Sequence, residues 1–562
     1  MKKIYIINLF CVFLCTSTFT HAQETDKAAF DLSKNLTIYH NILKELNLLY
    51  VDSLDNEKLI NKGIESMLEE LDPYTIYLNE KDMVDFKTQT TGEYGGIGTL
   101  IGKRDEHVFI SQVYEGLPAD KAGLKAGDKI ISINGENTVG MDMQEATDIM
   151  KGRPNTSFTM TVERPYSDQK VQTFTIHREK IQLDCVPYDT LLNNNVGYLL
   201  FTNFTNKAEQ RVKETVKKLK KEGATSLIID LRGNPGGLLD QAVKVVNLFI
   251  PKNETVVATK GRISQWDRSY QTTKNALDEE IPIVILINRG SASASEIVAG
   301  TIQDLDRGVI MGTHSFGKGL VQTTREVGYN SKLKVTTSKY YIPSGRCIQA
   351  LDYTHRNDDG SVGHIPDSLI SAYKTRNGRT VYDGGGIMPD IKVESEDFSN
   401  LTKQLSRTYQ IFDFATWYAN TQPKPSSLVT VDDNLFEKFV SFVDTSDFDY
   451  ESESYSMLKK LKEAVAKEKH EHAPDLSAVE TLLKPKLNTD LWLYKDEIED
   501  LIEFEINKRF FYQKGGYAQA VHTDETVEEA VELLNDGEKY KGMLDGTIPV
   551  DSSIKQKQEK DD

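Results

Sequence analysis

The chain has few of the residues that build disulfide or metal-based frameworks. It contains four cysteines and ten histidines in 562 residues. Two of the cysteines lie in the first apolar segment, and the other two, Cys185 and Cys347, are far apart and have no CxxC pattern or histidine neighbour. A disulfide framework and a cysteine-based metal or redox site are therefore not expected. Whether Cys185 and Cys347 pair stays open.

Positive charge and long apolar runs are also scarce. The 67 Lys and Arg residues face 85 Asp and Glu residues, which gives a formal net charge of -18. Such an acidic chain is a poor match for a phosphate backbone, so nucleic acid is not an expected partner. After the first segment, no apolar run approaches the length of a transmembrane helix. We expect no integral membrane segment in the mature protein.

The first 23 residues, MKKIYIINLFCVFLCTSTFTHAQ, have the pattern of a secretory signal peptide. Lysines precede an apolar stretch that is too short to span a bilayer, and the small-x-small sequence THA precedes Gln23. Bulky residues before the two cysteines argue against a lipoprotein. Cleavage after Ala22 removes two lysines and takes the formal charge from -18 to -20. We predict export to the periplasm of a Gram-negative bacterium.

Apolar patterning divides the rest of the chain into regions of different type. Apolar residues at roughly helical spacing predict helices before residue 85. Between about residues 176 and 400, the continuous apolar strands SLIID and IPIVILIN alternate with amphipathic helices. This alternation is typical of an α/β layer fold with both faces of its sheet covered. Charged helical segments dominate beyond residue 400, and the tail DSSIKQKQEKDD is predicted to be disordered.

A turn of small residues, GSASASEIVAG, follows the strand IPIVILIN. Ser293 stands between this strand and the next helix, whose N-terminus offers unpaired N–H groups to a developing oxyanion. The small neighbours leave room for a substrate backbone. Ser291, Ser293 and Ser295 are also typical helix caps. On this stretch alone, capping is the simpler interpretation.

A serine nucleophile needs a base, and the nearby sequence offers two candidates. His314 is the only histidine within 40 residues of Ser293, but no carboxylate stands at an evident supporting position. Lys318, in SFGKGLVQ, has apolar neighbours and no acid in that stretch, so burial would lower its pKa and allow it to act as a base. Gln322 offers an acceptor that would orient the amine without adding charge.

The stretch GTHSFGK, residues 312–318, also matches the start of a nucleotide-binding P-loop. The next residue is Gly319, where a P-loop needs Ser or Thr to bind magnesium. An exported protein also lacks a ready supply of nucleoside triphosphate. We reject nucleotide binding and predict neither a metal nor an organic cofactor.

Five motifs occur in one order along residues 30–400. They are DLRGNPGG, GSASASEIVAG, THSFGKGLVQ, YYIPSGRCIQ and GGGIMPDI, and a glycine-rich cluster precedes them. In this order they resemble the carboxyl-terminal processing peptidases, also called tail-specific proteases. The resemblance implies a crotonase-like α/β core and a serine–lysine dyad, with Ser293 as the nucleophile, Lys318 as the base and Gln322 positioning the lysine.

The same resemblance assigns the oxyanion hole to the N–H groups of Gly237 and Ala294. The chemistry agrees, since GNPGG follows a buried strand and a backbone without side chains can approach a substrate carbonyl closely. A glycine-rich turn that only allows positive backbone torsions is the alternative. Cys347 stands where the family often has a serine, which would add redox sensitivity.

The glycine cluster GEYGGIGTLIG resembles the carboxylate-binding loop of PDZ domains. Its residues Gly95, Gly96, Ile97 and Gly98 would present N–H groups to the terminal carboxylate of a peptide, and the next strand would pair with that peptide. The segment PADKAGLKAGDKIISINGENTVGM fits the PDZ pattern, and a helix from Met143 to Met150 would form the far wall of the groove. A glycine-rich hairpin without a ligand is the alternative.

The predicted fold is an α/β crotonase-like protease core with an inserted, mostly β PDZ-like domain, an N-terminal helical segment and a helical C-terminal domain. The six predicted regions are a signal peptide (1–22), an N-terminal helical region (23–85), the PDZ-like domain (86–175), the serine protease core (176–400), the helical domain (401–550) and a disordered tail (551–562).

We predict a serine endopeptidase that captures protein C-terminal tails through its PDZ domain and cleaves near them. Its expected partners are proteins or peptides with free C-termini, and a homo-oligomer or an adaptor protein stays open. One alternative is a non-catalytic PDZ scaffold that binds C-terminal tails. Another is a periplasmic holdase that prevents aggregation without producing fragments.

Overall fold

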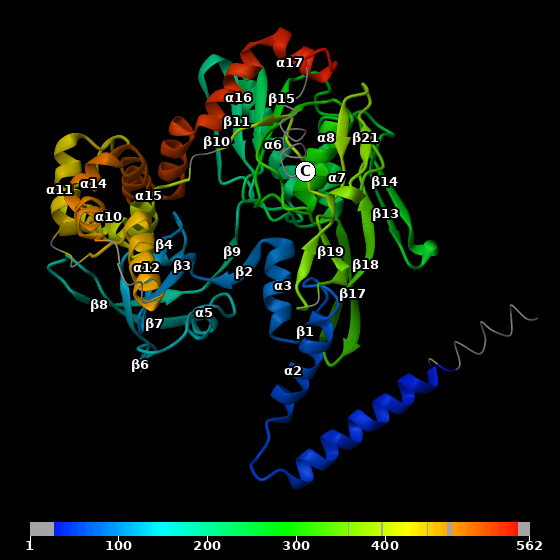
Figure 1. Ribbon diagram of the computed structural model, residues 1–562, viewed down its shortest axis with the longest axis horizontal. Helices are drawn as coiled ribbons and strands as arrows, with labels where there is room; N and C mark the ends of the chain where they lie inside the picture. Colours follow the sequence, from blue (N-terminus) through cyan, green and yellow to red (C-terminus); the bar gives the residue numbers. More distant parts are fainter. Residues whose placement is uncertain are drawn as a thin grey trace, which may run out of the picture.

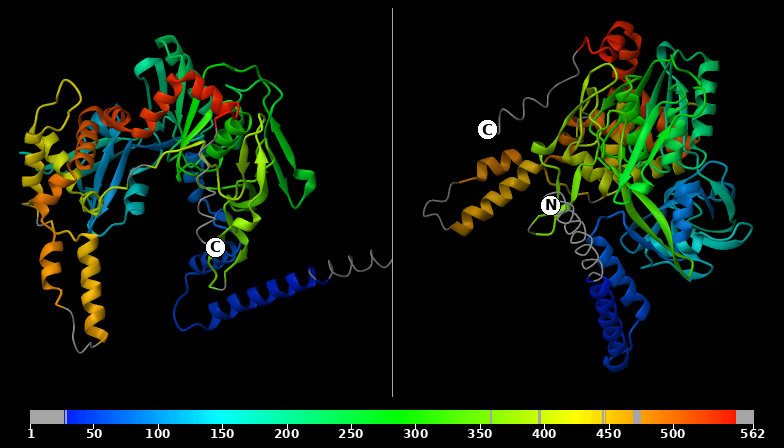
Figure 2. Two further views of the ribbon diagram at one scale, coloured as in Figure 1. Left: turned by 45° about the horizontal axis from the view of Figure 1, so that its top comes forward. Right: turned by 90° about the vertical axis from the view of Figure 1, so that its right-hand side faces the viewer.

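The computed structural model describes residue 27 and residues 29–548, apart from residues 358, 395–396, 445, 447 and 469–474. The predicted signal peptide and the predicted disordered tail lie outside the described residues. Figure 1 shows an α/β core, a PDZ sheet and a helical C-terminal domain that lies beside that sheet. Figure 2 shows the N-terminal helix, residues 29–49, projecting away from all three.

The core is built on a six-stranded sheet in the order β10-β11-β12-β15-β16-β23. All neighbouring pairs are parallel except β10 with β11. Its strands are β10 (Tyr188–Leu191), β11 (Val196–Leu200), β12 (Ser226–Asp230), β15 (Ile283–Ile287), β16 (Val309–Gly312) and β23 (Ile391–Lys392). The residues of β12, β15 and β16 are all buried, as expected for continuous apolar strands.

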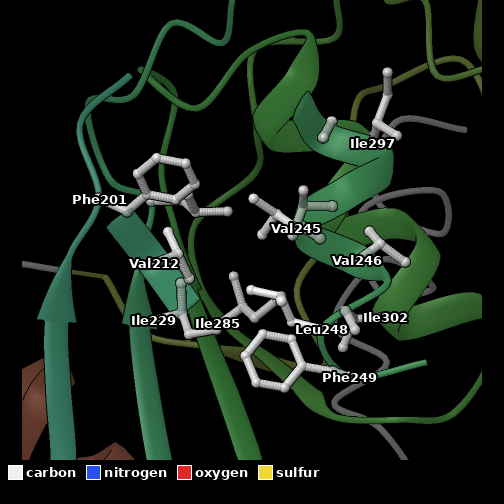
Figure 3. Packing of buried hydrophobic residues seen from close by; sticks show 14 of the residues in the cluster. Phe201, Val212, Ile229, Val245, Val246, Leu248, Phe249, Ile285, Ile297 and Ile302 are labelled. Atoms are coloured by element: carbon white, nitrogen blue, oxygen red, sulfur yellow. The ribbon is translucent and has the colours of Figure 1, made fainter. Parts of the chain in front are cut away.

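Helices cover both faces of this sheet. They are α6 (Ala208–Glu222), α7 (Leu239–Val246) and α8 (Ala294–Asp304) on one face, and α16 (Glu525–Asn535) and α17 (Gly537–Leu544) on the other. Figure 3 shows the first face, where Ile229 and Ile285 of the sheet pack against Val245 of α7. Fully burying a side chain of this size contributes about 1.5–3 kcal/mol. The last two helices of the described residues are thus part of the α/β core.

A second sheet lies beside the core and carries a long hairpin. It contains β1 (Ile76–Leu78), β13 (Thr255–Gly261), β14 (Arg268–Gln271), β17 (Leu320–Gly328) and β18 (Ser331–Tyr341). Strand β1 pairs with β18 with Ile76 opposite Lys334. In the sequence, α2 (Asn56–Glu69) lies between the N-terminal helix and β1, and α3 (Asp82–Thr91) follows β1. The pairing brings the N-terminal segment to the side of the hairpin that starts just after Lys318.

The PDZ sheet has the order β3-β4-β5-β7-β8, with β6 beside β5. Its elements are β3 (Thr99–Arg104), β4 (His107–Val113), α4 (Pro118–Ala122), β5 (Lys129–Ile133), β6 (Glu136–Asn137), α5 (Met143–Met150), β7 (Ser157–Glu163) and β8 (Val171–His177). The predicted helix over 143–150 is confirmed. Strands β2 (Glu93–Gly96) and β9 (Glu179–Gln182) pair with each other and connect this domain to the rest of the chain. Strand β3 is an edge strand, and α5 lies beside it.

The C-terminal domain is helical, as predicted, and has its own aromatic core around Phe414, Phe436 and Phe439. Its helices are α9 (Asn400–Arg407), α10 (Gln410–Thr421), α11 (Asp433–Asp444), α12 (Glu453–Glu468), α13 (Ser477–Leu483), α14 (Leu487–Leu493) and α15 (Lys495–Thr523). The remaining short strands are β19 (Leu351–Arg356), β20 (Val362–His364), β21 (Ala372–Lys374) and β22 (Thr380–Tyr382). In the described part of the chain, no helix combines the length and apolarity that a membrane crossing requires.

The helical domain is fastened to the PDZ domain by polar contacts. Arg104 of β3 makes a two-pronged ion pair with Asp413 of α10, with distances of 2.7 and 3.0 Å. Helix α15 is broken at Phe511 and Tyr512, and Tyr512 has φ 56° and ψ -158°, a conformation that is costly for a side-chain-bearing residue. At this break the Tyr512 hydroxyl donates to Asp120 of the PDZ domain at 2.8 Å.

Candidate active site

Ser293 is the residue immediately before helix α8, at the carboxyl end of the buried strand β15. Its backbone has φ 56° and ψ -112°, which is strained for any residue with a side chain. The neighbouring serines are both fully buried, and their hydroxyls donate to main-chain carbonyls: Ser291 to Leu231 at 2.7 Å and Ser295 to Asn234 at 2.9 Å. The Ser293 hydroxyl is partly exposed and donates to no residue that the structure describes. Of the three serines, only Ser293 has its proton available.

The GNPGG turn lies directly against Ser293. The N–H of Ala292 donates to the Asn234 carbonyl at 3.0 Å. A side chain at Gly236, which has φ 99°, would place its Cβ 2.6 Å from the Ala292 carbonyl oxygen and 2.9 Å from Ser293 Cβ. Only glycine therefore allows this turn and the serine turn to approach so closely.

The two N–H groups predicted to form an oxyanion hole lie on either side of this contact. Gly237 is exposed, with φ 142°, and forms an isolated parallel bridge with Phe204. Ala294 is the first residue of α8, where a helical N–H has no partner within its own helix. Neither N–H donates to an acceptor within the described residues. Their role in binding an oxyanion remains a prediction.

Glu296 is a residue of the candidate site that the sequence reasoning missed. It is fully buried in α8, and its carboxylate accepts four hydrogen bonds. Oε2 accepts from the N–H groups of Ser293 (2.7 Å) and Lys318 (2.9 Å). Oε1 accepts from the Ser315 hydroxyl (2.6 Å) and the Gly317 N–H (2.7 Å). One carboxylate thus ties the main chain of Ser293 to that of Lys318.

The electrostatics of Glu296 reflect two opposed effects. Burial raises the pKa of the carboxyl group, and the four hydrogen bonds lower it, with burial the larger effect. The S-x-x-E spacing from Ser293 to Glu296 is a capping-box pattern, which could have indicated half of this arrangement. Nothing in the sequence indicates the other half, because Ser315, Gly317 and Lys318 reach Glu296 only through the fold.

Tyr340 of β18 provides a second tie between the two segments. It is buried, and its hydroxyl lies within hydrogen-bonding distance of the carbonyl oxygens of Lys318 and, at 3.3 Å, of Ser293. Burial raises the pKa of this phenol well above its ordinary value, so it remains a neutral donor. The main chains of Ser293 and Lys318 are therefore both held at the N–H group and at the carbonyl group.

The Lys318 side chain is half-buried, with Nζ 4.2 Å from the centre of the Tyr74 ring. Burial lowers the pKa of this amine to about 8, and the positive charge of Lys334 lowers it further, while the carboxylates of Glu296 and Asp72 oppose both effects. The sequence argument placed no acid near Lys318. This was wrong, because the fold brings the carboxylates of Glu296 and Asp72 from other segments close to the amine. The lowered pKa follows from burial instead.

The remaining predicted side chains are less directly connected. The structure contains no hydrogen bond between the described side chains of Ser293 and Lys318, or between those of Lys318 and Gln322; such bonds often tighten only when substrate is bound. Gln322 donates through Nε2 to the Thr336 hydroxyl at 3.1 Å. His314 Nδ1 lies 3.3 Å from the Gly385 carbonyl oxygen.

The predicted carboxylate-binding loop is only partly open. Gly95 and Gly96 belong to β2 and pair with β9, and Ile97 is buried in the PDZ core. The ring of Tyr94 packs over Gly96, and its phenol oxygen accepts a hydrogen bond from the Gly98 N–H. A peptide carboxylate that used the Gly98 N–H would have to displace Tyr94. Binding by this loop remains a prediction.

Comparison with known proteins places the chain in a family. Three family descriptions match it: Peptidase family S41 over residues 195–355, PDZ domain over residues 109–164, and probable PDZ-protease, C-terminal helical domain, over residues 401–534. The carboxy-terminal-processing protease of Bartonella bacilliformis is 37% identical over 348 residues, which cover 61% of this chain and 79% of that relative. The chain belongs to the carboxy-terminal-processing proteases.

This carboxy-terminal-processing protease is a serine-type peptidase with a PDZ domain and a helical C-terminal domain, and the predicted fold is confirmed. A probable CtpA-like serine protease of Staphylococcus aureus is also 37% identical, over 58% of this chain and 64% of that relative. Among solved structures, the photosystem II D1 C-terminal processing protease is 26% identical over 62% of this chain and 85% of its own, with a TM-score of 0.34.

Cys185 and Cys347 do not pair with each other. Burial raises the pKa of the Cys185 thiol to about 11 and also raises that of Cys347. Because the thiolate is the reactive form, both thiols are poorly reactive near neutral pH. The redox sensitivity predicted for Cys347 therefore finds no support. No group of metal-ligating side chains occurs within the described ranges.

Proposed function

We propose that this protease is exported to the periplasm, captures the C-terminal tails of proteins through its PDZ domain and cleaves near them with a serine–lysine dyad. Ser293 is the nucleophile and Lys318 the base, Gln322 orients the amine, and the N–H groups of Gly237 and Ala294 bind the oxyanion. The carrying observation is that one carboxylate, Glu296, ties the backbone of a strained serine with an available proton to that of a lysine with a lowered pKa. The signal pattern of the first 23 residues supports export.

The chemistry follows acyl transfer. The neutral Lys318 amine takes the proton of the Ser293 hydroxyl while Oγ attacks the scissile carbonyl, and the resulting ammonium protonates the leaving amine as the peptide bond breaks. Water then attacks the acyl-enzyme and passes a proton to the same amine, and the ammonium returns that proton to Ser293 Oγ as the ester bond breaks and the acid product leaves. Donors placed at the start of α8 and at the GNPGG turn stabilise the oxyanion in both steps.

The wild-type enzyme is expected to become more active as pH rises through about 8. The pKa of Lys318 is lowered to about 8, and only the neutral amine accepts a proton, so the active fraction falls below that pH. The acid limb of kcat/KM on a fluorogenic peptide measures this directly. A rate that is independent of pH between 6 and 9 would exclude Lys318 as the base.

Tail capture is supported by the edge position of β3. A peptide can pair with an edge strand through main-chain bonds, which recognise many sequences, while the loop before the strand holds the carboxylate. The neighbouring helix α5 lies beside this edge strand, and Gly98 of the predicted loop immediately precedes it. A free terminal carboxylate should therefore be part of the recognised substrate.

Two measurements test the proposal. Wild type should cut an unstructured protein and cut a peptide with a free C-terminus faster than its carboxyl-amidated twin, whereas Ser293→Ala should bind the free peptide but cut neither. Equal cutting of the two peptides would contradict tail capture. A Ser293→Ala variant that retains the protein's whole function would instead indicate the PDZ scaffold, and protection of an unfolded client without fragments would indicate the holdase.

A further inference from the structure

We propose that Tyr74 is a positioning residue for the reaction: its ring covers the Lys318 amine, and the turn that carries it is hydrogen-bonded through to Gln322. The N-terminal segment would then complete the active site of a protease whose core lies more than a hundred residues further along the chain. This inference rests on the proposed role of Lys318 as the base.

The turn that presents Tyr74 is tightly built. Asp72 is buried, and its Oδ1 accepts from the N–H groups of Tyr74 (2.9 Å) and Thr75 (2.8 Å). Its Oδ2 accepts from the Thr75 hydroxyl at 3.0 Å. Pro73 fixes the backbone between them. The backbone that carries the Tyr74 ring is thus fixed by its own turn.

Hydrogen bonds through Thr336 connect this turn to Gln322. The Thr75 hydroxyl oxygen accepts from the N–H of Thr336 at 3.1 Å. The Thr336 hydroxyl in turn accepts from Gln322 Nε2 at 3.1 Å. This commits the Gln322 nitrogen to Thr336 and leaves its carbonyl oxygen as the acceptor for an amine. Gln322 is thus oriented by Thr336 of β18, the residue whose backbone N–H the N-terminal turn also binds.

The Tyr74 ring itself is held between two partners. Lys318 Nζ lies 4.2 Å from the ring centre, and the Tyr353 ring meets the Tyr74 ring edge-on at 6.1 Å. Burial and the hydrogen bond with Tyr353 raise the pKa of the Tyr74 phenol. The phenol therefore stays neutral near the lysine and does not compete for its proton.

Three charged groups face the amine from the elements around it. Lys334 comes from β18, Glu296 from α8 and Asp72 from the N-terminal turn. The two carboxylates favour the ammonium and Lys334 disfavours it, so burial is the effect that keeps the pKa low. The ring face attracts a cation, which favours the ammonium, but the ring also excludes water. Because burial is the largest cause of the lowered pKa, losing the ring should raise it.

The experiment compares Tyr74→Phe and Tyr74→Ala with wild type. Tyr74→Phe keeps the cover and should keep the wild-type acid limb of kcat/KM. Tyr74→Ala should move that limb up by about one pH unit, with about a tenfold lower kcat/KM at pH 7. Tyr77→Ala is the matched control, since Tyr77 is a half-buried tyrosine of the same segment, on β1, and should leave the limb in place.

A readout without turnover separates this inference from the proposed function. In a Ser293→Ala background, the pH dependence of Lys318 modification by an amine-reactive reagent, read by mass spectrometry, reports the pKa of the amine directly. Tyr74→Ala should shift that curve upward. An unchanged or lowered curve overturns the role of Tyr74, whereas full activity of Lys318→Ala overturns the dyad itself and leaves the measured shift standing.

Discussion

Replacing Lys318 with alanine is expected to lower kcat/KM for a cleavable peptide at least about 100-fold, because a positioned base contributes about two to four orders of magnitude. Lys318→Arg should be equally inactive. The guanidinium keeps the positive charge and the contact with the Tyr74 ring, but it does not lose its proton in proteins. Steady-state kinetics at pH 8 on a fluorogenic peptide measure both variants.

Comparing Lys318→Ala with Lys318→Arg shows whether Lys318 acts as a base or only as a positive charge. If Lys318 acted only as a cation that attracts an anionic substrate, Lys318→Arg would retain most activity and Lys318→Ala would not. Lys339→Ala is the control, because Lys339 is an exposed lysine of β18 and its loss should leave kcat/KM unchanged. Peptide binding by all three variants should match wild type, since none of these residues lies in the PDZ domain.

Replacing Glu296 with glutamine is expected to lower kcat at least about tenfold and to destabilise the fold by about 1–3 kcal/mol. The carboxylate oxygens each accept two hydrogen bonds, one pair from Ser293 and Lys318 and the other from Ser315 and Gly317. An amide has a single oxygen, so one pair of buried donors must face an NH2 group. Either Ser293 and Lys318 lose the hydrogen bonds to their common acceptor, or Ser315 and Gly317 lose theirs.

The residual activity of Glu296→Gln has a diagnostic pH dependence. The Glu296 carboxylate raises the pKa of Lys318, so removing its charge should lower that pKa and move the acid limb of kcat/KM to lower pH. Glu528→Gln, an exposed substitution on α16, controls for loss of a negative charge. Thermal melting gives the stability change, and wild-type kcat with an unshifted limb would show that Glu296 does not position the dyad.

The sequence is most informative where one segment carries the whole signal. The buried strands β12 and β15 and the helix after each of them follow from apolar runs and helical periodicity. The helix Met143–Met150 follows from the resemblance of the preceding segment to the PDZ pattern. In each case the residues that determine the element are contiguous, so local patterning suffices.

Local sequence patterns cannot predict contacts between segments that are far apart in the chain. Nothing local indicates that α16 and α17, from the region predicted to be a separate helical domain, cover the second face of the core sheet. The same holds for Asp72 and Tyr74, which reach Lys318 from a segment read only as helical. The motif resemblance named Ser293 and Lys318, and their catalytic roles remain predictions.

The arrangement of the C-terminal helices restricts how the PDZ domain can move. Helices α10 and α15 contact the PDZ domain through Asp413 and Tyr512. The chain continues from α15 into α16, which packs on the core sheet. Movement of the PDZ domain away from these helices would have to break the contacts of Arg104 with Asp413 and of Asp120 with Tyr512. Deleting the last third of the chain would therefore remove both the helices that contact the PDZ domain and the helices that cover one face of the core sheet.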